Sequence, residues 1–370
     1  MIRTGDIKGS YIDYSNVKYI DESFHTKNVK SQLKCGDILI ARHGSSGHGV
    51  IFDSNKPANA LNIVILRTDE KLLLSRYLVQ LLDSPGIQKQ VAEASAGSTQ
   101  NVINTSQIAK LLISIPELSE QKEVVNVCEA VDSLIETLER QISKKKAIKQ
   151  GSMQELLTGK KRLPGFSWEW ATHRLGDLGV FVKGSGISRA ESNTGRIPAV
   201  RYGELYTTHQ NYVTHFVSHI SKEIATKAKQ VYKGDILFAA SGETKEEIGK
   251  CAAIIDDQTV FAGGDILILR PHEPYNPVFM GTLLNTEEVC RQRAEKGQGD
   301  AVVHIHADSL GSINIKIPEI KEQDAIAEIL LGMDKEIEML EMKLEKYRQL
   351  KQGMMQQLLT GKIRLVQGVE

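Results

Sequence analysis

The feature that most constrains the fold of this chain is a long internal repeat. Residues 115–163 align without a gap with residues 317–365, and 23 of these 49 positions are identical. Two long copies predict a duplicated unit with pseudo-twofold symmetry, because solenoid proteins need three or more short repeats. We therefore expect two related halves within one polypeptide.

The similarity continues upstream of these segments, where it is weaker. Residues 36–41 (Gly-Asp-Ile-Leu-Ile-Ala) match residues 234–239 (Gly-Asp-Ile-Leu-Phe-Ala), and residues 3–5 match residues 201–203, at an offset of 198. Each half therefore consists of a divergent globular head followed by a similar helical segment. This arrangement predicts a shared scaffold that carries two different heads.

The helical segments have the apolar spacing of a coiled coil. Steps of three and four residues place apolar side chains in one narrow seam, which is clearer in the second copy than in the first. The predicted seam residues are Cys128, Val131, Ile135, Leu138, Ile142 and Leu156 in the first copy, and Leu330, Met333, Ile337, Leu340, Leu344, Tyr347, Met354 and Leu358 in the second. Each segment is expected to form one helix of roughly 38 residues, or ~57 Å.

A helix with a single apolar stripe needs a partner that covers the stripe. We expect the two helices to pair with each other within the chain, because two similar seams are natural partners. The alternative is that each helix packs on its own head. Polar residues interrupt the seam at Lys145, Lys149 and Ser152 in the first copy and at Lys351 in the second.

The two heads combine short apolar strands, glycine-rich turns and a few helices, which predicts an α+β fold. The predicted domains are residues 1–116 and 164–318 for the heads, and residues 117–163 and 319–370 for the helical regions. In the first head we expect strands near 37–41 and 61–66 and a helix near 71–95. In the second head we expect strands near 233–239, 266–269 and 313–317, and helices near 219–230 and 275–295.

Composition limits the classes of protein to which the chain can belong. It has 46 Lys and Arg residues and 46 Asp and Glu residues, so a DNA-binding function requires local clustering of basic groups. The four cysteines form no Cys-x-x-Cys pair, so neither a zinc ribbon nor a disulfide framework is indicated. No apolar run approaches the ~20 residues of a membrane helix, and the N-terminus does not have the pattern of a signal peptide. We therefore expect a cytoplasmic protein.

Three fragments that resemble catalytic motifs are better explained as structure. Residues 261–265 and 276–279 resemble incomplete methyltransferase motifs, but we predict a strand followed by a Pro-rich turn. Asp235 with Glu243-Thr-Lys245 has the residue types of a metal-dependent nuclease, yet the aligned loop of the first head, residues 45–47, has no such pair, which favours a solvated loop. The segment His304-Ile-His306 has no carboxylate or cysteine beside it, which favours a DNA or core contact over a metal site. We therefore predict no catalytic, cofactor-binding or metal-binding residues.

The repeated motifs resemble those of the specificity (S) subunit family of type I restriction–modification systems. The motifs that carry the resemblance are Ile-Pro-Glu-(Leu/Ile)-x-Glu-Gln at 115–121 and 317–323, Leu-Leu-Thr-Gly-Lys-x-Arg-Leu at 156–163 and 358–365, Gly-Asp-Ile-Leu at 36–39 and 234–237, residues 162–170, and residues 97–103. They span nearly the whole chain, and the helical motifs occur twice in the expected order.

The resemblance implies a non-catalytic protein with two target-recognition domains, each of which reads one half of a bipartite double-stranded DNA site. It implies that the two long helices form an antiparallel coiled coil, which separates the domains and docks two methyltransferase (M) subunits. Restriction (R) subunits would then join the complex. S-adenosylmethionine, ATP and magnesium would be bound by those partners and not by this chain.

The first head departs from the family pattern at its N-terminus. The second head has residues 168–197 before its Val200–Gly203 segment, whereas the first head begins at the equivalent point and lacks about thirty residues. We therefore expect the first target-recognition domain to be N-terminally incomplete, which puts its capacity to read DNA in question. A gene rearrangement, a misplaced start or completion by another chain would account for the difference.

Candidate DNA contacts are polar side chains on glycine-rich loops or beside strands, where groups that face a DNA groove are expected. In the second head they are Lys183, Ser185, Arg201, Tyr202, Ser241, Thr244, Lys245, Lys296, Gln298, His304 and His306. In the first head they are Arg3, Arg42, His43, Ser45, His48, Ser98, Gln100 and Asn101. Each of them is equally consistent with a solvated or structural role, because a resemblance in fold does not locate base contacts.

Other functions are consistent with parts of this pattern. The chain could be a stand-alone DNA-binding scaffold, or an inactive fragment that serves as a recombination reservoir for specificity. It could also be an enzyme, in which case the purified chain would cut or methylate DNA alone. Co-purification with an M subunit would separate the specificity subunit from the stand-alone scaffold.

Overall fold

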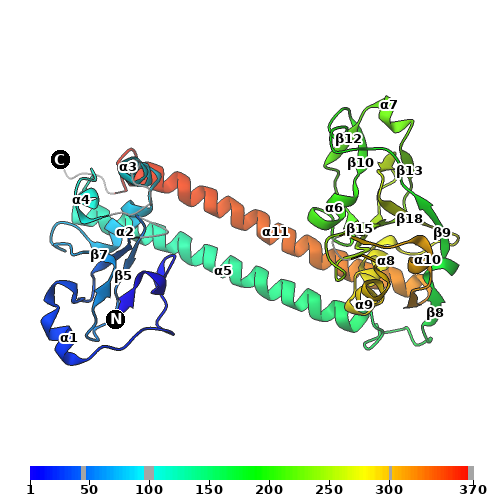
Figure 1. The fold of residues 1–370 in the computed structure, drawn as a ribbon. Helices are drawn as coiled ribbons and strands as arrows, with labels where there is room; N and C mark the ends of the chain where they lie inside the picture. The colour runs from blue at the N-terminus through cyan, green and yellow to red at the C-terminus, as the bar shows by residue number, and fades with distance from the viewer. Residues whose placement is uncertain (43–46, 96–103, 300–301, 366–370) are drawn as a thin grey trace. The chain divides into compact units, whose positions relative to one another are not determined.

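The computed structural model describes residues 1–42, 47–95, 104–299 and 302–365. The chain divides into two compact units, which we describe separately. Unit 1 consists of residues 1–142 and 340–370, and unit 2 consists of residues 143–339. The division falls inside both long helices, α5 (Leu118–Leu156) and α11 (Ile320–Leu358), so each unit contains a part of each helix (Figure 1).

Unit 1 is built on a three-stranded antiparallel sheet with the strand order β5 (Gly49–Ile51), β4 (Ile38–Ala41) and β7 (Ile63–Leu66). Two shorter pairs join β1 (Ile2–Arg3) to β6 (Ala60–Leu61) and β2 (Ile7–Lys8) to β3 (Tyr11–Ile12). The helices of the head are α1 (Glu22–Lys27), α2 (Ser75–Asp83), α3 (Pro85–Ser95) and α4 (Thr105–Ile108), with short 3-10 turns at Thr4–Asp6 and Val29–Ser31.

Unit 2 has a five-stranded sheet with the order β11 (Tyr212–Val213), β16 (Cys251–Ile254), β14 (Ile236–Ala239), β18 (Ile266–Pro271) and β9 (Gly179–Lys183). A four-stranded sheet has the order β12 (Ser218–Ile220), β10 (Ile197–Val200), β17 (Val260–Ala262) and β13 (Lys229–Val231). Two further pairs join β15 (Ser241–Gly242) to β19 (Val303–His304) and β20 (Asn314–Ile317) to β8 (Ala171–Arg174). The helices are α6 (Tyr202–Thr207), α7 (Lys222–Ala225), α8 (Pro277–Leu284), α9 (Glu287–Lys296) and α10 (Ala307–Gly311), with a 3-10 turn at Leu175–Asp177.

The repeated Gly-Asp-Ile-Leu motif begins the central strand of both units. Gly36 and Gly234 have φ angles of 92° and 91°, in the left-handed region that glycine adopts without steric cost. Asp37 and Asp235, which follow them, are both 1% exposed, and each is paired with an arginine on or next to the neighbouring strand. Strands β4 and β14 are buried on both faces because helices cover one face and smaller strands cover the other.

The predicted strands near 37–41, 61–66, 233–239, 266–269 and 313–317 are confirmed, with shifts of a few residues. The helix predicted near 219–230 is wrong, because β12, the four-residue helix α7 and β13 occupy this stretch. Ile220 and Val231 are buried in strands that pair with β10 and β17, so sheet pairing overrides the local helical pattern. The helices predicted near 71–95 and 275–295 each form two shorter helices, α2 and α3 in unit 1 and α8 and α9 in unit 2.

The two long helices run antiparallel to each other in both units. In unit 1, Lys351 pairs with Asp132 and Arg348 pairs with Glu139, both at 2.6 Å. In unit 2, the ammonium of Lys145 lies 2.6 Å from Glu336. Residue numbers on α11 fall as those on α5 rise, as an antiparallel pair requires. The predicted pairing of the two helices within the chain is therefore confirmed.

All of the predicted seam side chains are buried or half-buried. Leu138, Ile142 and Leu344 form a buried cluster between the helices of unit 1, together with half-buried Leu340 and Tyr347. The other ends of the seam pack on the heads: Cys128, Met354 and Leu358 pack on the head of unit 1, and Leu156 and Leu330 pack on the head of unit 2. The three lysines that interrupt the seam are ion-paired across the helices, Lys149 with Asp334, Lys145 with Glu336 and Lys351 with Asp132. Each head therefore packs on both helices rather than on one.

Two reciprocal ion pairs join the end of each helical segment to the start of the other. In unit 2, the guanidinium of Arg162 makes two 2.7 Å hydrogen bonds to the carboxylate of Glu322. In unit 1, the guanidinium of Arg364 lies 2.6 Å from the carboxylate of Glu120. Both glutamates are 2% exposed, so each arginine satisfies a buried negative charge.

A second repeated contact attaches each helix to its head. The side chain of Gln121 accepts a hydrogen bond from the Leu74 backbone at 2.9 Å and donates one to the Pro116 carbonyl at 2.8 Å. Gln323 accepts from the Asn276 backbone at 3.0 Å and donates to the equivalent proline carbonyl at 2.9 Å. The repeated Ile-Pro-Glu-x-x-Glu-Gln motif thus contacts the arginine that follows the other helix through its second glutamate, and its own head through its glutamine.

We predict that Arg162→Ala destabilises unit 2 by about 3 kcal/mol, because it leaves the buried Glu322 carboxylate without its cation. Urea unfolding followed by circular dichroism measures this change. The control is Arg348→Ala, which removes an ion pair whose two side chains are 52% and 47% exposed. That variant should cost less than about 1 kcal/mol. Equal effects of the two substitutions would contradict a special role for the reciprocal pairs.

Candidate nucleic-acid interface

Several of the candidate DNA contacts of the second head meet on the short pair β15 and β19. Ser241 lies opposite His304 in the antiparallel register, and the Ser241 hydroxyl is 2.9 Å from Nδ1 of His304. The backbone of Gln298 exchanges two hydrogen bonds with that of His304, at 2.9 and 2.8 Å. Ser241 is therefore a neighbour of Gln298 and His304 on one surface, although it is distant from both in sequence.

Helix α6 adjoins this pair. The hydroxyl of Tyr206 donates a 3.0 Å hydrogen bond to the Ser241 carbonyl, and Lys250 donates to the Tyr206 carbonyl at 3.2 Å. Burial raises the pKa of Tyr206 to about 12, so this hydroxyl stays protonated as a donor. Tyr202, at the start of α6, is 42% exposed. We call this region the α6–β15–β19 surface; its exposed and half-buried candidates are Tyr202, Ser241, Thr244, Lys245, Gln298 and His304.

Sequence reasoning missed the residues that support this surface. Arg293 is 1% exposed, and its guanidinium donates a 2.6 Å hydrogen bond to the Gly249 carbonyl at the end of the turn that follows β15. Tyr206 likewise connects α6 to β15 through the hydrogen bond from its side chain to a backbone carbonyl. Neither residue carries a signal in the sequence, because the contacts depend on chain segments more than thirty residues apart.

The other candidates in the second head lie around this surface or beside β17. Lys296 ends α9 and is half-buried, and His306 precedes α10 and is exposed. Lys183 ends β9 and is exposed. Ser185 is held to the chain after α7, because its hydroxyl donates to the Lys227 carbonyl at 2.8 Å.

The candidate Arg201 is engaged in a structural contact. Its guanidinium lies 3.3 Å from Glu204, which is 4% exposed and also accepts a hydrogen bond from Ser218. Nε2 of His209 lies 3.8 Å from the same carboxylate. Burial acts to raise the pKa of Glu204, but contacts with His209, Ser218 and Arg201 outweigh it and lower the pKa below the ordinary value. Nε of Arg201 is therefore engaged in an ion pair with a buried carboxylate of the fold.

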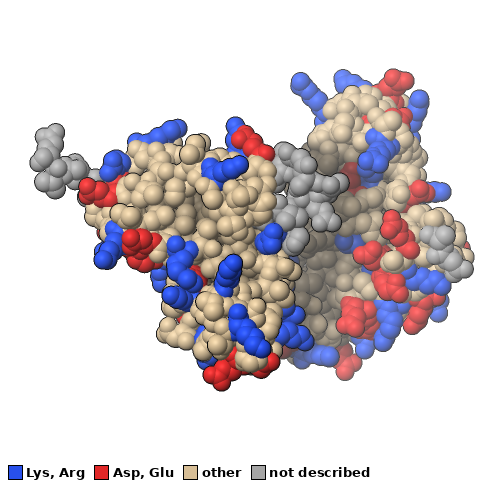
Figure 2. Space-filling view, turned by 60° about the vertical axis from the view of Figure 1, so that its left-hand side comes forward, with Lys and Arg blue, Asp and Glu red and all other residues tan. Residues whose placement is uncertain are grey.

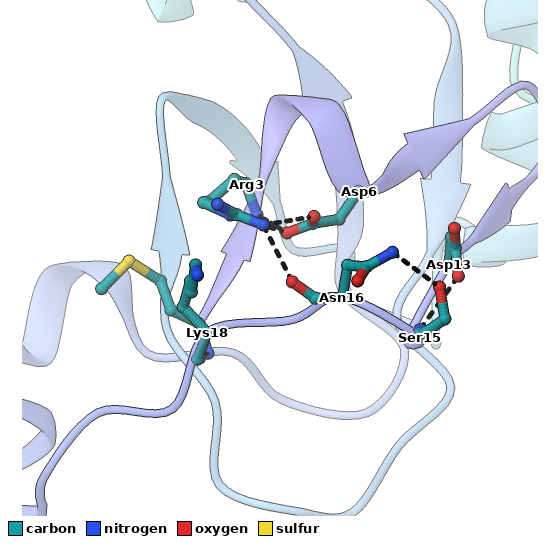
Figure 3. A network of polar contacts seen from close by, with 7 residues as sticks. Arg3, Asp6, Asp13, Ser15, Asn16 and Lys18 are labelled. Atoms are coloured by element: carbon teal, nitrogen blue, oxygen red, sulfur yellow. Dashed lines mark hydrogen bonds and ion pairs between the residues drawn. The ribbon is translucent and has the colours of Figure 1, made fainter.

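The first head repeats this contact at Arg3 (Figure 3). The guanidinium of Arg3 lies 3.0 Å from the carboxylate of the buried Asp6 and donates to the Asn16 carbonyl, also at 3.0 Å. The pairs Arg3–Asp6 and Arg201–Glu204 have the same spacing and enclose the same kind of helix start. Their repetition indicates a structural role for both arginines.

Two other candidates in the first head are described by the structure. Arg42 is half-buried after β4. His48 pairs with Asp83 at 2.8 Å, and this hydrogen bond raises the pKa of His48. His43, Ser45, Ser98, Gln100 and Asn101 lie outside the described residues. As DNA contacts, the candidates in both heads remain predictions.

The fragments that resemble catalytic motifs have structural roles. Asp235 is ion-paired with Arg270 at 2.7 Å and is buried. The predicted Pro-rich turn at 276–279 is wrong, because Asn276 accepts hydrogen bonds from the first backbone N–H groups of α8 and Pro277 begins this helix. Within the described residues, no group of three or more His, Cys, Asp or Glu side chains is placed to hold a metal ion.

The charges at the surface are mixed. Figure 2 shows Lys and Arg side chains with Asp and Glu side chains between them on the face turned toward the viewer. This distribution agrees with the equal numbers of basic and acidic residues. A polyanion would have to be bound by particular basic side chains rather than by a uniformly positive face. Among the helices that the structure describes, none is both long and apolar enough to cross a membrane.

Comparison with known proteins identifies the class. The family described as type I restriction modification DNA specificity domain matches residues 2–147 and 168–347. The MjaVIII specificity subunit of a type I restriction enzyme from Methanocaldococcus jannaschii is 24% identical, over 96% of this chain and 87% of that protein. The S subunit of the type I system from M. genitalium shares 15% identity with a TM-score of 0.60, covering 90% of this chain and 84% of its own. A chain from a structure that describes complex assembly and conformational transition of the type I R-M system also has a TM-score of 0.60 at 15% identity, covering 98% of this chain and 91% of its own.

The fold is thus that of the specificity subunits of type I restriction–modification systems. Because the family match covers most of the sequence in two copies, the chain belongs to the type I DNA specificity subunit family. Members of this family are the non-catalytic subunits that recognise DNA, which agrees with the prediction from the repeated motifs.

We predict that Glu204→Gln flattens the dependence of stability on pH on the acid side. A carboxyl whose folded pKa is lowered stabilises the fold above its unfolded value, and this contribution is lost as the pH falls through the folded pKa. The native chain should therefore lose stability more steeply than the variant below about pH 4.5, the ordinary value. Thermal melts of both proteins between pH 7 and pH 3 measure the difference. Parallel curves would show that Glu204 does not titrate with unfolding.

Proposed function

We propose that this specificity subunit reads a bipartite DNA site, with one head for each half-site, and that its paired helices dock two M subunits. The observation that carries the proposal is the duplication itself. Each unit has one head attached to both antiparallel helices, and the same glutamate, glutamine and arginine contacts recur in both. Two similar scaffolds with dissimilar heads are suited to reading two different short sequences.

In unit 2, the α6–β15–β19 surface has the side-chain types that reading DNA requires. Gln298 and His304 can exchange hydrogen bonds with base edges, and Lys245 can contact a phosphate. Phosphate contacts fix the position of the protein, while contacts with base edges distinguish sequences. Two weak readers in one chain bind as one strong reader, because the second contact is made at a high effective concentration.

The paired helices provide a reason for a fixed spacing between the two half-sites. Helices of 39 residues that pair along their lengths form a stiffer connection than a flexible linker would. The pseudo-twofold repeat also offers two equivalent helical surfaces, which suit two copies of an M subunit. R subunits would join this assembly, and S-adenosylmethionine, ATP and magnesium would be bound by the partners.

Methylome sequencing of cells that express this chain with its M subunit tests the proposal. We expect one methylated sequence in two parts, separated by a spacer of constant length. A continuous motif, or methylation without any motif, would refute the bipartite readout. A chain that copurifies with no M subunit would instead favour the stand-alone scaffold.

We predict that Lys245→Ala weakens DNA binding by the assembled complex for all sequences alike. Loss of one phosphate contact should lower the slope of log affinity against log salt by about 1 and leave the methylated motif unchanged. Fluorescence anisotropy at several salt concentrations measures the slope. Lys335→Ala on α11 is the control, because it removes the same charge from an exposed position on the helix. Equal slopes for the two variants would exclude a phosphate contact at Lys245.

We predict that adding one heptad to both helices lengthens the unread spacer. Seven residues inserted after Ile142 in α5 and seven after Met339 in α11 keep the seam in register and add about 10.5 Å. At about 3.4 Å per base pair, the spacer should grow by about three base pairs. Methylome sequencing reads the new spacer directly. An unchanged spacer would show that the helices do not set this distance.

A further inference from the structure

The residues beside the seam lie on two opposite sides of the helix pair. Residues that directly follow a seam position make ion pairs on one side, where Glu139 follows Leu138 and Arg348 follows Tyr347. Residues that directly precede a seam position lie on the other side, because each residue turns the chain by about 100° around its helix. We call this second side the open face of each unit.

The open faces of the two units consist of equivalent residues of the repeat. In unit 2 the open face is formed by Lys144, Ile148 and Gly151 of α5 and by Ile329 and Gly332 of α11; in unit 1 it is formed by Lys346, Leu350 and Gly353 of α11 and by Val127 and Ala130 of α5. All of these residues are exposed except Ile329 and Val127, which are half-buried. Each open face lies within one unit.

The printed ion pairs set the two helices of each open face at the same level. In unit 2, Lys149 contacts Asp334, so two residues further along the antiparallel pair Gly151 is level with Gly332. In unit 1, Lys351 lies 2.6 Å from Asp132, which puts Gly353 level with Ala130 in the same way. Both open faces therefore have two small residues side by side.

One position of the repeat exposes a large apolar side chain in both copies. Ile148 is 45% exposed in unit 2, and its equivalent Leu350 is 48% exposed in unit 1. Within the aligned residues 115–163 and 317–365, all of which the structure describes, no other position does so. A single exposed apolar residue is ordinary, but packing within either unit does not account for the recurrence of this one.

The glycines of the open faces are not required by the fold of the chain itself. A Cβ atom added to Gly151 or Gly353 would meet nothing within 4 Å, and neither residue has a positive φ angle. A glycine inside a helix destabilises it relative to alanine, so its presence at the same place in both copies needs another reason. Close approach of a second backbone is such a reason.

The open face continues an interface that each unit already has. Ile329 packs against the apolar core of the head in unit 2, and Val127 packs against that of the head in unit 1. A helix laid on Ile148 and Ile329 would extend this apolar contact along the helix pair. The same helix laid on Leu350 and Val127 would do so in unit 1.

A cation stands at the same end of the apolar position in both units. Lys144 and Lys346 are exposed, precede Ile148 and Leu350 by one helical turn, and form no ion pair among the described residues. By contrast, Lys145, Lys149 and Lys351 of the seam are all ion-paired across the helices. An acidic side chain on the partner would complement Lys144 or Lys346.

We propose that the open face of each unit binds one helix of an M subunit. A glycine or alanine of that helix would lie over the small residues, an apolar side chain over Ile148 or Leu350, and an acidic side chain beside Lys144 or Lys346. This mode of recognition places the apolar side of a helix in a groove. The inference rests on the proposed function, which supplies the M subunit, and two faces with the same groups suit two copies of one partner.

A charge placed on the apolar position tests each face separately. Ile148→Glu should release the M subunit from unit 2, and Leu350→Glu should release it from unit 1. Each variant should then hold one M subunit, and the double variant none. Native mass spectrometry of the chain co-expressed with its M subunit counts the copies.

Met342→Glu is the matched control for these variants. Met342 is 60% exposed on α11, but it lies two residues from the nearest seam positions, and its repeat counterpart is Arg140. This variant should keep both M subunits. Thermal melts of the chain alone establish that the glutamate variants fold.

Gly151→Leu separates close approach from a role in the fold. Leucine is the better helix former, so the substitution should raise the melting temperature of the chain alone. It should also weaken binding of the M subunit to unit 2 at least tenfold, measured by calorimetry with Leu350→Glu present to silence unit 1. A fall in melting temperature together with unchanged binding would contradict the proposal.

The outcomes distinguish this inference from the proposed function. If the double variant Ile148→Glu, Leu350→Glu still binds two M subunits, the open faces are not the docking sites, although docking itself stands. Loss of an M subunit from Met342→Glu as well would show that no particular face is used. A dimer of the chain alone that the double variant dissociates in sedimentation velocity would assign the faces to a second copy. A native chain that binds no M subunit would refute both proposals.

Discussion

The antiparallel pairing of the two long helices depends on two buried glutamates, each neutralised by an arginine from the other repeat. Glu120 and Glu322 begin the two long helices, and Arg364 and Arg162 follow the ends of those helices. A buried carboxylate without a cation is strongly destabilising, so each helix start needs the end of the other helix beside it. Antiparallel pairing satisfies both glutamates at once. Each helix packing on its own head alone would satisfy neither.

The same short motifs serve the helix pair and the heads together. Gln121 and Gln323 attach the first turn of each helix to a head helix through backbone hydrogen bonds. The Gly-Asp turn before β4 and β14 directs the central strand into the core with a buried aspartate that an arginine neutralises. Duplication thus repeats these attaching contacts, and the regions between them are free to diverge. This divergence is what two dissimilar recognition surfaces require.

The two units differ in the sheets of their heads. Unit 2 has a five-stranded sheet and a separate four-stranded sheet, and unit 1 has a three-stranded sheet. The contacts that attach the long helices to each other and to the heads do not differ, since the glutamate, glutamine and arginine contacts recur in both units.

The sequence by itself determined the repeat, the seam, the length of the helices and the family, because these follow from periodicity and from motifs that are local in the chain. It did not determine the strands β12 and β13, which lie on either side of Ser221. Nor did it determine the hydrogen bonds by which Tyr206 holds Ser241 and Arg293 holds the turn that follows. Those contacts join segments far apart in sequence, and whether a short apolar stretch becomes a strand depends on the edge that it meets. Only the tertiary structure decided which candidate side chains are committed to ion pairs, as Arg3 and Arg201 are, since burial of their acidic partners is a property of the packed core.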